Sequence, residues 1–578
     1  MCLADVIMAN SNSRDANFWV FRDGRKKVCG RRVLRELLAA LERLAQGVIT
    51  LDSVITALMV AGELESALAD SDSIGLSKVE QLTDGLAAML GSQRPVSYLH
   101  ALIEEVSRVP VPQEIVLSPA EGFAYYALHP LDFAILAEQT AGLRNTRLAV
   151  IGIRSIGTTL SAIATATCSQ RGRSAERITV RPTGHAYNRS LQFTSPQLEW
   201  VRRQNTVSAD FLVVDEGPGR SGSSFLSVAE ALVAQGVSPD RILFLGSRPV
   251  DPAQLCAHDA VSRWNRFRFF HPPTHVYRRF SNHLYIGAGT WRNLLIDGQS
   301  QWPACWPQME RVKFLSRDKT SIFKFEGFGR FGDQVLHRDH CLAQAGFGPP
   351  AEAAGDGMIR YQFIPGTLLD ATQVSHFLLE HIAQYCAFRR SEFSVPEEPS
   401  QVAEMFRFNL HQAFDIDWDF DPALLATKNP VLVDGRMQPH EWIRSKDGTI
   451  IKVDGCTHGD DHFFPGPTDI AWDLAGAIVE WNLDAAATEF LLASFHRLTG
   501  DDPRMRIEIF TLAYSVFRLA YCKMAKTTVL ESDDEPILQS TIANYCAQAE
   551  RQLLTLQHSS TQRTLPTLRV PNLSGVAD

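Results

Sequence analysis

The residues best suited to chemistry lie in one stretch, FLVVDEGPGRSGSSFL, which runs from Phe211 to Leu226. Its apolar start predicts a buried strand, and two acids, Asp215 and Glu216, follow directly. A loop rich in glycine and serine then leads into an apolar helical pattern. Because N–H groups at a helix start hold phosphate and carboxylates accept sugar hydroxyls, this order suits a phosphorylated sugar. The alternative is an ordinary strand-to-helix turn with a serine cap.

Two other segments carry groups of the same kind. GIRSIGTT, residues 152–159, follows a second apolar strand pattern and ends in small residues and hydroxyls at a helix start. RPTGHAYNR, residues 181–189, lies between the two loops and is basic. A tight turn and a solvated basic loop are the respective alternatives.

The order of these three segments resembles that of type I phosphoribosyltransferases. The resemblance implies transfer from phosphoribosyl pyrophosphate (PRPP) to a nucleobase-like or other nitrogen acceptor, with Mg²⁺ present and pyrophosphate released. It assigns catalysis to Asp215, Glu216, Arg181 and His185, and the first two also to the ribose hydroxyls or the metal. The implied PRPP contacts are Arg154, Ser155, Gly157, Thr158, Arg189, Ser221, Gly222, Ser223 and Ser224. The loop after Glu216 is one residue longer than the family pattern, and Ser221 replaces the common threonine.

A second constellation lies in the C-terminal half. SIFKFEGFG, residues 321–329, predicts a strand that presents Lys324, and a helical stretch with Asp339 follows. Further on, VLVDGRMQPHEWI (431–443), GTIIKVDG (448–455) and GPTDIAWDLAGA (466–477) contain the other polar groups: Asp434, Arg436, Glu441, Asp454, Asp469 and Asp473.

This order resembles the aminoglycoside-phosphotransferase branch of the protein-kinase-like fold. The resemblance implies that Lys324 holds the phosphates of ATP, that Asp339 is its acidic partner and that Asp454 binds Mg²⁺. Asp469 and Asp473 would brace the catalytic loop. Arg436 stands where the catalytic aspartate is expected, and Glu441, a second metal ligand, stands where an asparagine is expected. A reshaped loop with Asp434 or His440 as the base, or a degenerate nucleotide-binding domain, therefore remains open.

A further polar cluster follows Asp454. His458, Asp460, Asp461 and His462 form the sequence HGDDH, whose residue types suit a transition metal. A flexible polar loop is the alternative.

The elements that must position these residues divide the chain into four parts. Helical patterns predict a helical region over residues 1–110, within which FWVF at 18–21 is a candidate strand. Strands alternating with helices over 111–280 imply a parallel sheet wrapped by helices, with ligand loops at the strands' carboxyl ends. A bilobal kinase-like domain over 281–557 and a flexible tail over 558–578 complete a multidomain α/β and α+β chain.

Composition limits the partners. The 578 residues are 45% hydrophobic and 21% charged, and their net charge of −9 gives no electrostatic case for nucleic acid or an anionic membrane. The ten cysteines include no CxxC pair, so no zinc or disulfide framework is expected. Without a signal peptide or a run of about 18 apolar residues, we expect a cytoplasmic protein that binds small molecules, with a homodimer left open.

Three functions are compatible with these observations. The first is PRPP-dependent phosphoribosyl transfer, linked to a kinase-like domain whose own activity is open. The second is a regulatory sensor that binds PRPP or a nucleotide without catalysis. The third is a small-molecule kinase whose phosphoribosyltransferase-like domain is structural.

Overall fold

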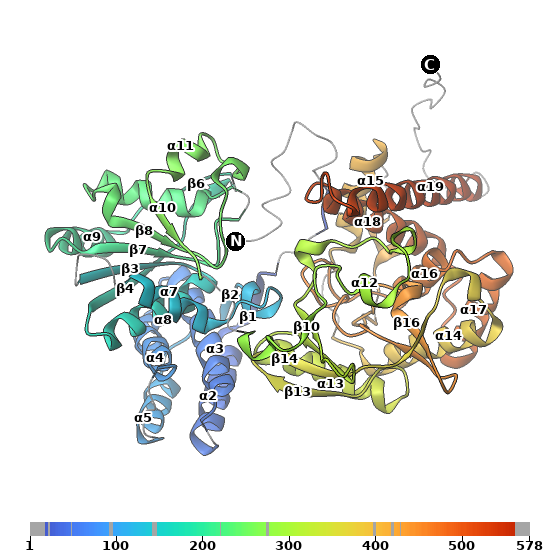
Figure 1. The fold of residues 1–578 in the computed structure, drawn as a ribbon, viewed down its shortest axis with the longest axis horizontal. Helices are drawn as coiled ribbons and strands as arrows, with labels where there is room; N and C mark the ends of the chain where they lie inside the picture. Colours follow the sequence, from blue (N-terminus) through green and yellow to red (C-terminus); the bar gives the residue numbers. More distant parts are fainter. Residues whose placement is uncertain are drawn as a thin grey trace.

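The computed structural model describes most of the chain. The described residues are 18–20, 24–47, 49–91, 96–140, 147–185, 187–219, 221–272, 277–396, 400–417, 421–427 and 429–560. They form an α/β half built on a parallel sheet and a second half in which an antiparallel sheet adjoins a helical lobe (Figure 1).

The first half is organised around a five-stranded sheet with the order β4-β3-β7-β8-β9, in which every pairing is parallel. The strands are β3 (Arg147–Ile153), β4 (Ser174–Val180), β7 (Asp210–Val214), β8 (Ile242–Leu245) and β9 (Arg268–Phe270). The chain moves outward from β3 to β4 and then returns to the other side of β3 with β7. The strand order therefore reverses between β3 and β7, and sheets of this type bind ligands at the carboxyl ends of the strands that flank such a reversal.

Helices cover both faces of this sheet (Figure 1). One face packs against α9 (Ser195–Thr206), α10 (Ser223–Ala234) and α11 (Ala260–Trp264). The other packs against α7 (Pro130–Gln139) and α8 (Ile156–Gln170). The predicted alternation of strands and helices around a parallel sheet is therefore confirmed, and the three central strands, β3, β7 and β8, are buried apolar runs, as expected for strands covered on both faces.

The N-terminal helices join the core of the same sheet. They are α2 (Gly30–Gln46), α3 (Leu51–Asp70), α4 (Leu76–Met89) and α5 (Val96–Ser107), and a strand pair, β1 (Lys26–Cys29) with β2 (Glu114–Leu117), closes the region. Their apolar faces share one hydrophobic cluster with Leu148 of β3 and Leu212 of β7. These helices can therefore contact the loops at the sheet's carboxyl edge.

The second half begins with an antiparallel sheet of order β10-β11-β12-β14-β13. Its strands are β10 (Leu284–Tyr285), β11 (Lys313–Leu315), β12 (Ser321–Phe325), β13 (Ala351–Gly355) and β14 (Met358–Gln362), and α13 (Arg330–Gln344) lies between β12 and β13 in the chain. A three-stranded sheet follows, formed by β15 (Gly366–Leu368), β16 (Trp442–Ser445) and β17 (Ile450–Lys452).

The helical lobe holds the largest apolar cluster. Its helices are α14 (His376–Glu392), α15 (Val402–Phe414), α16 (Ala471–Glu480), α17 (Ala485–Thr499), α18 (Ile507–Lys526) and α19 (Asp534–Ser560). Phe18 and Val20 are buried in this cluster, and the Trp19 backbone bonds the Asn409 side chain. The candidate strand at 18–21 is thus wrong for residues 18–20, and Phe21 lies outside the described residues. The expected tail at 558–578 begins as helix through Ser560, and its remainder also lies outside them.

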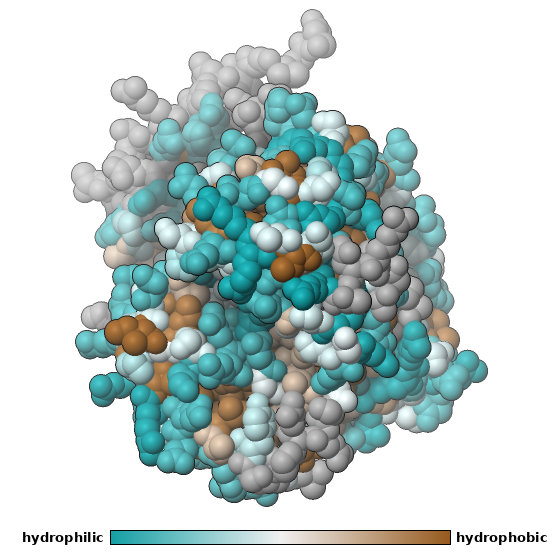
Figure 2. All heavy atoms as spheres, turned by 90° about the vertical axis from the view of Figure 1, so that its left-hand side faces the viewer, coloured by the Kyte–Doolittle hydropathy of each residue, from teal (hydrophilic) through white to brown (hydrophobic). Residues whose placement is uncertain are grey.

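Several contacts join the two halves. Arg330 of α13 pairs with Glu63 of α3 at 2.6 Å, and the Phe328 N–H donates to the Phe123 carbonyl at 3.0 Å, next to α6 (Glu121–Ala124). The expected boundaries at 110, 280 and 557 stay predictions. Figure 2 shows that the surface of the parallel-sheet half is mostly hydrophilic with scattered apolar spots. None of the described helices is long and apolar enough to cross a bilayer.

Candidate active site

A cavity of about 230 Å³ lies between the antiparallel sheet and the helical lobe. Its polar lining includes Lys324, Asp339, Arg436, His440, Glu441 and Asp454. These residues come from β12, α13 and the segments on either side of β16 and β17. The structure thus brings together all the residues expected for a kinase-like site except Asp434, which lies behind the cavity wall.

Lys324 is the central cation of this cavity. Its ammonium forms a short ion pair with Asp454 Oδ1 and lies 2.8 Å from Glu326 Oε1. Burial alone would lower the pKa of Lys324, but the two carboxylates raise it above its ordinary value. Burial likewise opposes ionisation of Asp454, yet Lys324, His458 and Lys313 hold the pKa of that carboxyl well below its usual range. Both groups are therefore charged at neutral pH.

The acidic partner of Lys324 differs from the expected one. The ion pairs of Lys324 within the described chain are to Asp454 and Glu326. Asp339 Oδ2 instead lies 2.7 Å from the Tyr361 hydroxyl, and burial raises the pKa of Asp339 to about 6. Glu326 is the first residue after β12, two positions beyond Lys324, and its buried side chain also lines the cavity. The prediction for Asp339 therefore needs correction to Glu326.

The loop from Asp434 to Glu441 is braced from below. Asp473 of α16, fully buried, accepts hydrogen bonds from the Asp434 N–H at 2.8 Å and the Gly435 N–H at 3.0 Å. Asp469 does not share this contact, since its carboxylate caps the Ala471 N–H and pairs with Arg506. Bracing by Asp473 agrees with the sequence-based expectation.

Asp434 is unsuited to the role of general base. It is fully buried, and its Oδ2 accepts from the Tyr385 hydroxyl at 2.5 Å and lies 3.2 Å from Lys452 Nζ. Its Oδ1 accepts from the Arg436 N–H at 3.1 Å. Both oxygens are thus engaged within the protein, and the carboxylate has a structural role.

The two other groups considered for the base position are also poor bases. The Arg436 guanidinium donates to the Tyr521 hydroxyl at 3.1 Å and lies 5.0 Å from the centre of that ring. His440 stacks on Trp291, and burial together with the charges of Lys452 and Arg518 lowers the pKa of His440 to about 3. Arg436 thus brings a positive charge, and His440 a neutral ring, to the cavity.

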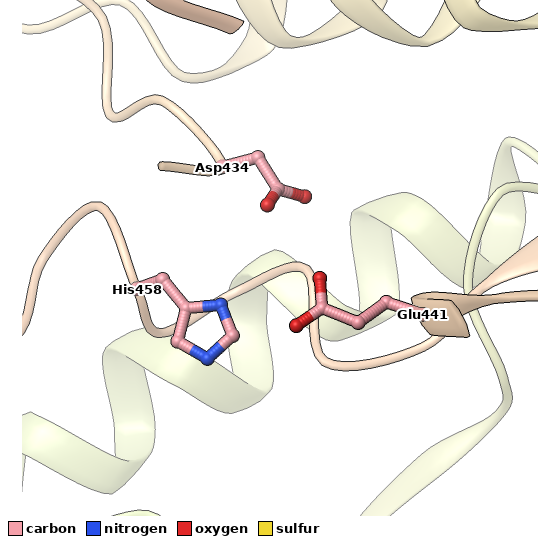
Figure 3. Close-up of side chains that lie close together, drawn as sticks. All are labelled: Asp434, Glu441 and His458. Atoms are coloured by element: carbon pink, nitrogen blue, oxygen red, sulfur yellow. The ribbon is translucent and has the colours of Figure 1, made fainter. Parts of the chain in front are cut away.

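Three groups come close enough to hold a metal ion. One ligand atom each of Asp434, Glu441 and His458 lies within 4.8 Å of the others (Figure 3). The two carboxylates, however, already contact the Lys452 ammonium, which lies 2.7 Å from Glu441 Oε2. The expected Mg²⁺ ligand Glu441 therefore does not fit a metal, whereas Asp454 keeps its Oδ2 beside His458 at 3.6 Å.

The HGDDH segment does not converge on one centre. His458 faces Asp454, Asp460 pairs with Arg338 at 3.3 Å, and the His462 ring lies 2.9 Å from the Tyr126 hydroxyl. Asp461 accepts from the Phe463 N–H at 2.8 Å. The hypothesis of a transition-metal cluster in this segment is therefore wrong.

In the other half, the acid pair lies where the sheet's strand order reverses. A Cβ atom at Gly157, in the turn after β3, would lie 2.7 Å from the Val214 carbonyl and 3.5 Å from Asp215 Oδ1, so the two loops are adjacent. Burial raises the pKa of Asp215 to about 6, and burial together with Glu121 raises that of Glu216 to about 7. Such shifted carboxyls are common at ligand sites.

The cations expected to bind pyrophosphate are paired with the N-terminal helices. Arg154 donates to Asp70 of α3 at 3.1 Å, and Arg181 forms a short ion pair with the same carboxylate. Ser155 has φ +101° and donates its N–H to the Ser66 hydroxyl at 3.2 Å. Strained backbone of this kind clusters at ligand sites. In this structure, however, α3 lies against the loop, and its Asp70 carboxylate pairs with both arginines.

The remaining residues predicted to contact PRPP lie in three places: the start of α8, the β5–β6 hairpin and the start of α10. Thr158 is buried, and Arg189 and His185 lie on the hairpin of β5 (Thr183–His185) and β6 (Asn188–Ser190), where His185 is exposed. Ser221, Ser223 and Ser224 are buried at the start of α10, with 2.9 Å between the first two hydroxyls. Gly222 has φ +70°, and a Cβ there would meet the Trp264 ring at 3.1 Å. Trp264 belongs to the apolar cluster on this face of the sheet.

One short segment contacts both sites. A Cβ at Gly122 would lie 2.7 Å from Glu216 Oε2, while Tyr125, three residues on, lines the cavity of Lys324. The sequence carried no visible signal for this segment, for Asp70 or for Lys452, because each acts through partners far away in the chain.

The comparisons with known proteins are weak. No family model matches the chain, and no curated protein has a matching sequence. A choline kinase from Streptococcus pneumoniae (14% identity, 41% of this chain, 89% of that one) and an ethanolamine kinase from Plasmodium vivax (10%, 41%, 79%) each match with a TM-score of 0.29. An aminoglycoside phosphotransferase from Alicyclobacillus acidocaldarius (14%, 44%, 90%) has the same score. TM-scores below 0.5 do not support the assignment of a function, so any functional conclusion depends on the geometry of the site.

Proposed function

We propose that the second half binds a nucleoside triphosphate and transfers a phosphoryl group to a small molecule. The observation that carries the proposal is the ion pair of Lys324 with Asp454, inside a cavity whose catalytic-type loop is braced by Asp473. A lysine and an acid in this relation suit phosphates and a divalent ion.

The cavity's own residues support this chemistry. Lys324 and Lys313, whose ammonium lies 3.9 Å from Asp454 Oδ2, give adjacent positive charges for a polyphosphate. Arg436 adds a third, and because the loose transition state of phosphoryl transfer asks mainly for charge stabilisation, an arginine there is useful even though it cannot act as a base. Asp454 is the residue that would hold a Mg²⁺ ion here, and the ion would supply further positive charge to a polyphosphate.

Binding of ATP to the full chain, followed by calorimetry, tests the proposal. Asp454→Asn should weaken binding by about tenfold or more, because the variant loses the charge that positions Lys324 and any metal. The matched control is Asp318→Asn, an exposed acid in the turn between β11 and β12. The proposal fails if the wild type binds no nucleotide, or if both variants behave alike.

A second candidate function is PRPP-dependent phosphoribosyl transfer in the first half. It is favoured by one observation: Asp215 and Glu216 lie at the strand-order reversal with raised pKa values, against the Gly157 turn. Pyrophosphate release from PRPP and Mg²⁺ with a panel of nucleobases tests it. Asp215→Asn with Glu216→Gln should abolish release, whereas the exposed Asp240→Asn should not. PRPP binding without release would favour a sensor.

A further inference from the structure

We infer that the Lys452 ammonium takes the place of a divalent cation at Glu441, so that the proposed nucleotide site holds one metal ion, at Asp454. This inference rests on the proposed function and adds that the site differs from the family pattern in the number of metal ions it holds. The family resemblance implies metal ligands at both Glu441 and Asp454, and the two carboxylates have different surroundings.

The Lys452 ammonium is held by oxygen atoms on several sides. It lies 2.7 Å from Glu441 Oε2, 3.2 Å from Asp434 Oδ2 and 3.3 Å from the carbonyl of Val453. A lysine ammonium has three N–H donors, of which two donate to Glu441 Oε2 and the Val453 carbonyl, and the Asp434 carboxylate adds an ion pair. Lys452 thus has the oxygen environment that a small cation would require.

The position of this ammonium is fixed by the fold. Lys452 ends β17, is 1% exposed and has its Nζ 6.0 Å from the centre of the Trp442 ring, on the paired strand β16. The backbone N–H of Lys452 donates to the Phe347 carbonyl at 2.8 Å. If the Lys452 side chain moved away, the buried carboxylates of Glu441 and Asp434 would lose their cation, and an uncompensated buried charge is strongly destabilising.

A divalent ion at Glu441 would meet two obstacles. Mg²⁺ needs free oxygen lone pairs at 2.0–2.1 Å, but Glu441 Oε2 already accepts a hydrogen bond from Lys452, and Asp434 Oδ2 is in an ion pair with the same ammonium. The ion would also lie beside the buried Lys452 ammonium, which is 2.7 Å from Glu441 Oε2, whereas the Lys313 ammonium is 3.9 Å from Asp454 Oδ2; repulsion between like charges is stronger at the shorter distance. Of the three groups drawn in Figure 3, the two carboxylates are therefore already neutralised by an internal cation, the Lys452 ammonium.

Asp454 offers a different environment. Its Oδ1 is paired with Lys324, but its Oδ2 lines the cavity at 3.6 Å from His458 Nε2 and 3.9 Å from Lys313 Nζ. Neither distance is that of a hydrogen bond. This oxygen can thus accept one metal ion that also binds a phosphate.

The test counts Mn²⁺ ions, detected by electron paramagnetic resonance, on the full chain with a non-hydrolysable ATP analogue. One ion per chain is expected in the wild type. Glu441→Gln, whose amide oxygen still accepts from Lys452, should leave Mn²⁺ affinity unchanged within about twofold, whereas Asp454→Asn should lower it by about tenfold or more. Circular dichroism checks that each variant is folded.

The outcomes separate the two proposals. Two ions per chain, or a tenfold loss of Mn²⁺ affinity in Glu441→Gln, would overturn the role of Lys452 while leaving nucleotide binding intact. Absence of analogue binding, with and without Mn²⁺, would refute the proposed function and this inference with it.

Discussion

Asp473→Ala is the substitution whose effect can be worked out most fully. In the folded protein the carboxylate accepts from two buried N–H groups, those of Asp434 and Gly435, at 2.8 and 3.0 Å. Its Oδ2 also lies 3.6 Å from Arg389 Nε. Alanine leaves both donors without an acceptor in a site closed to solvent, so the loop that carries Arg436 and Glu441 loses its support.

The size of the effect follows from these contacts. A hydrogen bond to a charged group contributes about 1.5–3 kcal/mol, and a buried donor left unsatisfied costs a similar amount. Part of this lost free energy is regained, because alanine removes a buried charge whose burial is itself unfavourable. The same cost of burial raises the pKa of Asp473 to about 6. We expect the free energy of unfolding of this half to fall by about 3 kcal/mol.

Urea unfolding followed by tryptophan fluorescence measures the change, since Trp442, Trp472 and Trp481 are buried in this half. For a slope of about 3 kcal/mol per molar, the midpoint should fall by about 1 M. Asp447→Ala, in an exposed turn, is the control. A loss below about 0.5 kcal/mol for Asp473→Ala would show that the bracing bonds contribute little, and the reasoning would be refuted.

Two further predictions concern the first half. Asp70→Asn should strengthen pyrophosphate binding by about tenfold, measured by calorimetry, because it frees Arg154 and Arg181 from their shared acid; unchanged or weaker binding would argue against a polyphosphate site there. Asp215 and Glu216 have folded-state pKa values raised to about 6 and 7, so the folded protein holds these protons more tightly than the unfolded chain. Stability should therefore fall as pH rises from about 4 to about 8, by about 3 kcal/mol per group, and the Asn/Gln double variant should lack this loss; identical pH profiles in urea unfolding would contradict the assignment.

Local structure could be predicted well from the sequence. The buried strand predicted from Phe211 onward coincides with β7, and the strand predicted to present Lys324 coincides with β12. Such elements are encoded by nearby residues, as runs or periodic patterns of apolar side chains. The order of motifs also placed Lys324 and Asp454 in one site although 130 positions separate them.

The partners of charged groups could not be predicted in the same way. Arg154 meets Asp70 only because α3 packs beside the sheet, a tertiary contact that no periodicity encodes. Lys452 meets Glu441 because β16 and β17 form a hairpin. Glu326, by contrast, lies only two residues after Lys324, directly after β12, so its contact with Lys324 is local in the sequence.

A crystal structure of the full chain with a non-hydrolysable ATP analogue and Mg²⁺ tests the central claim most directly. We predict that the phosphates lie in the cavity, with Lys324 within hydrogen-bond distance of a phosphate oxygen and one metal ion on Asp454. An analogue bound elsewhere, or a cavity that stays free of it at saturating concentration, would contradict the account.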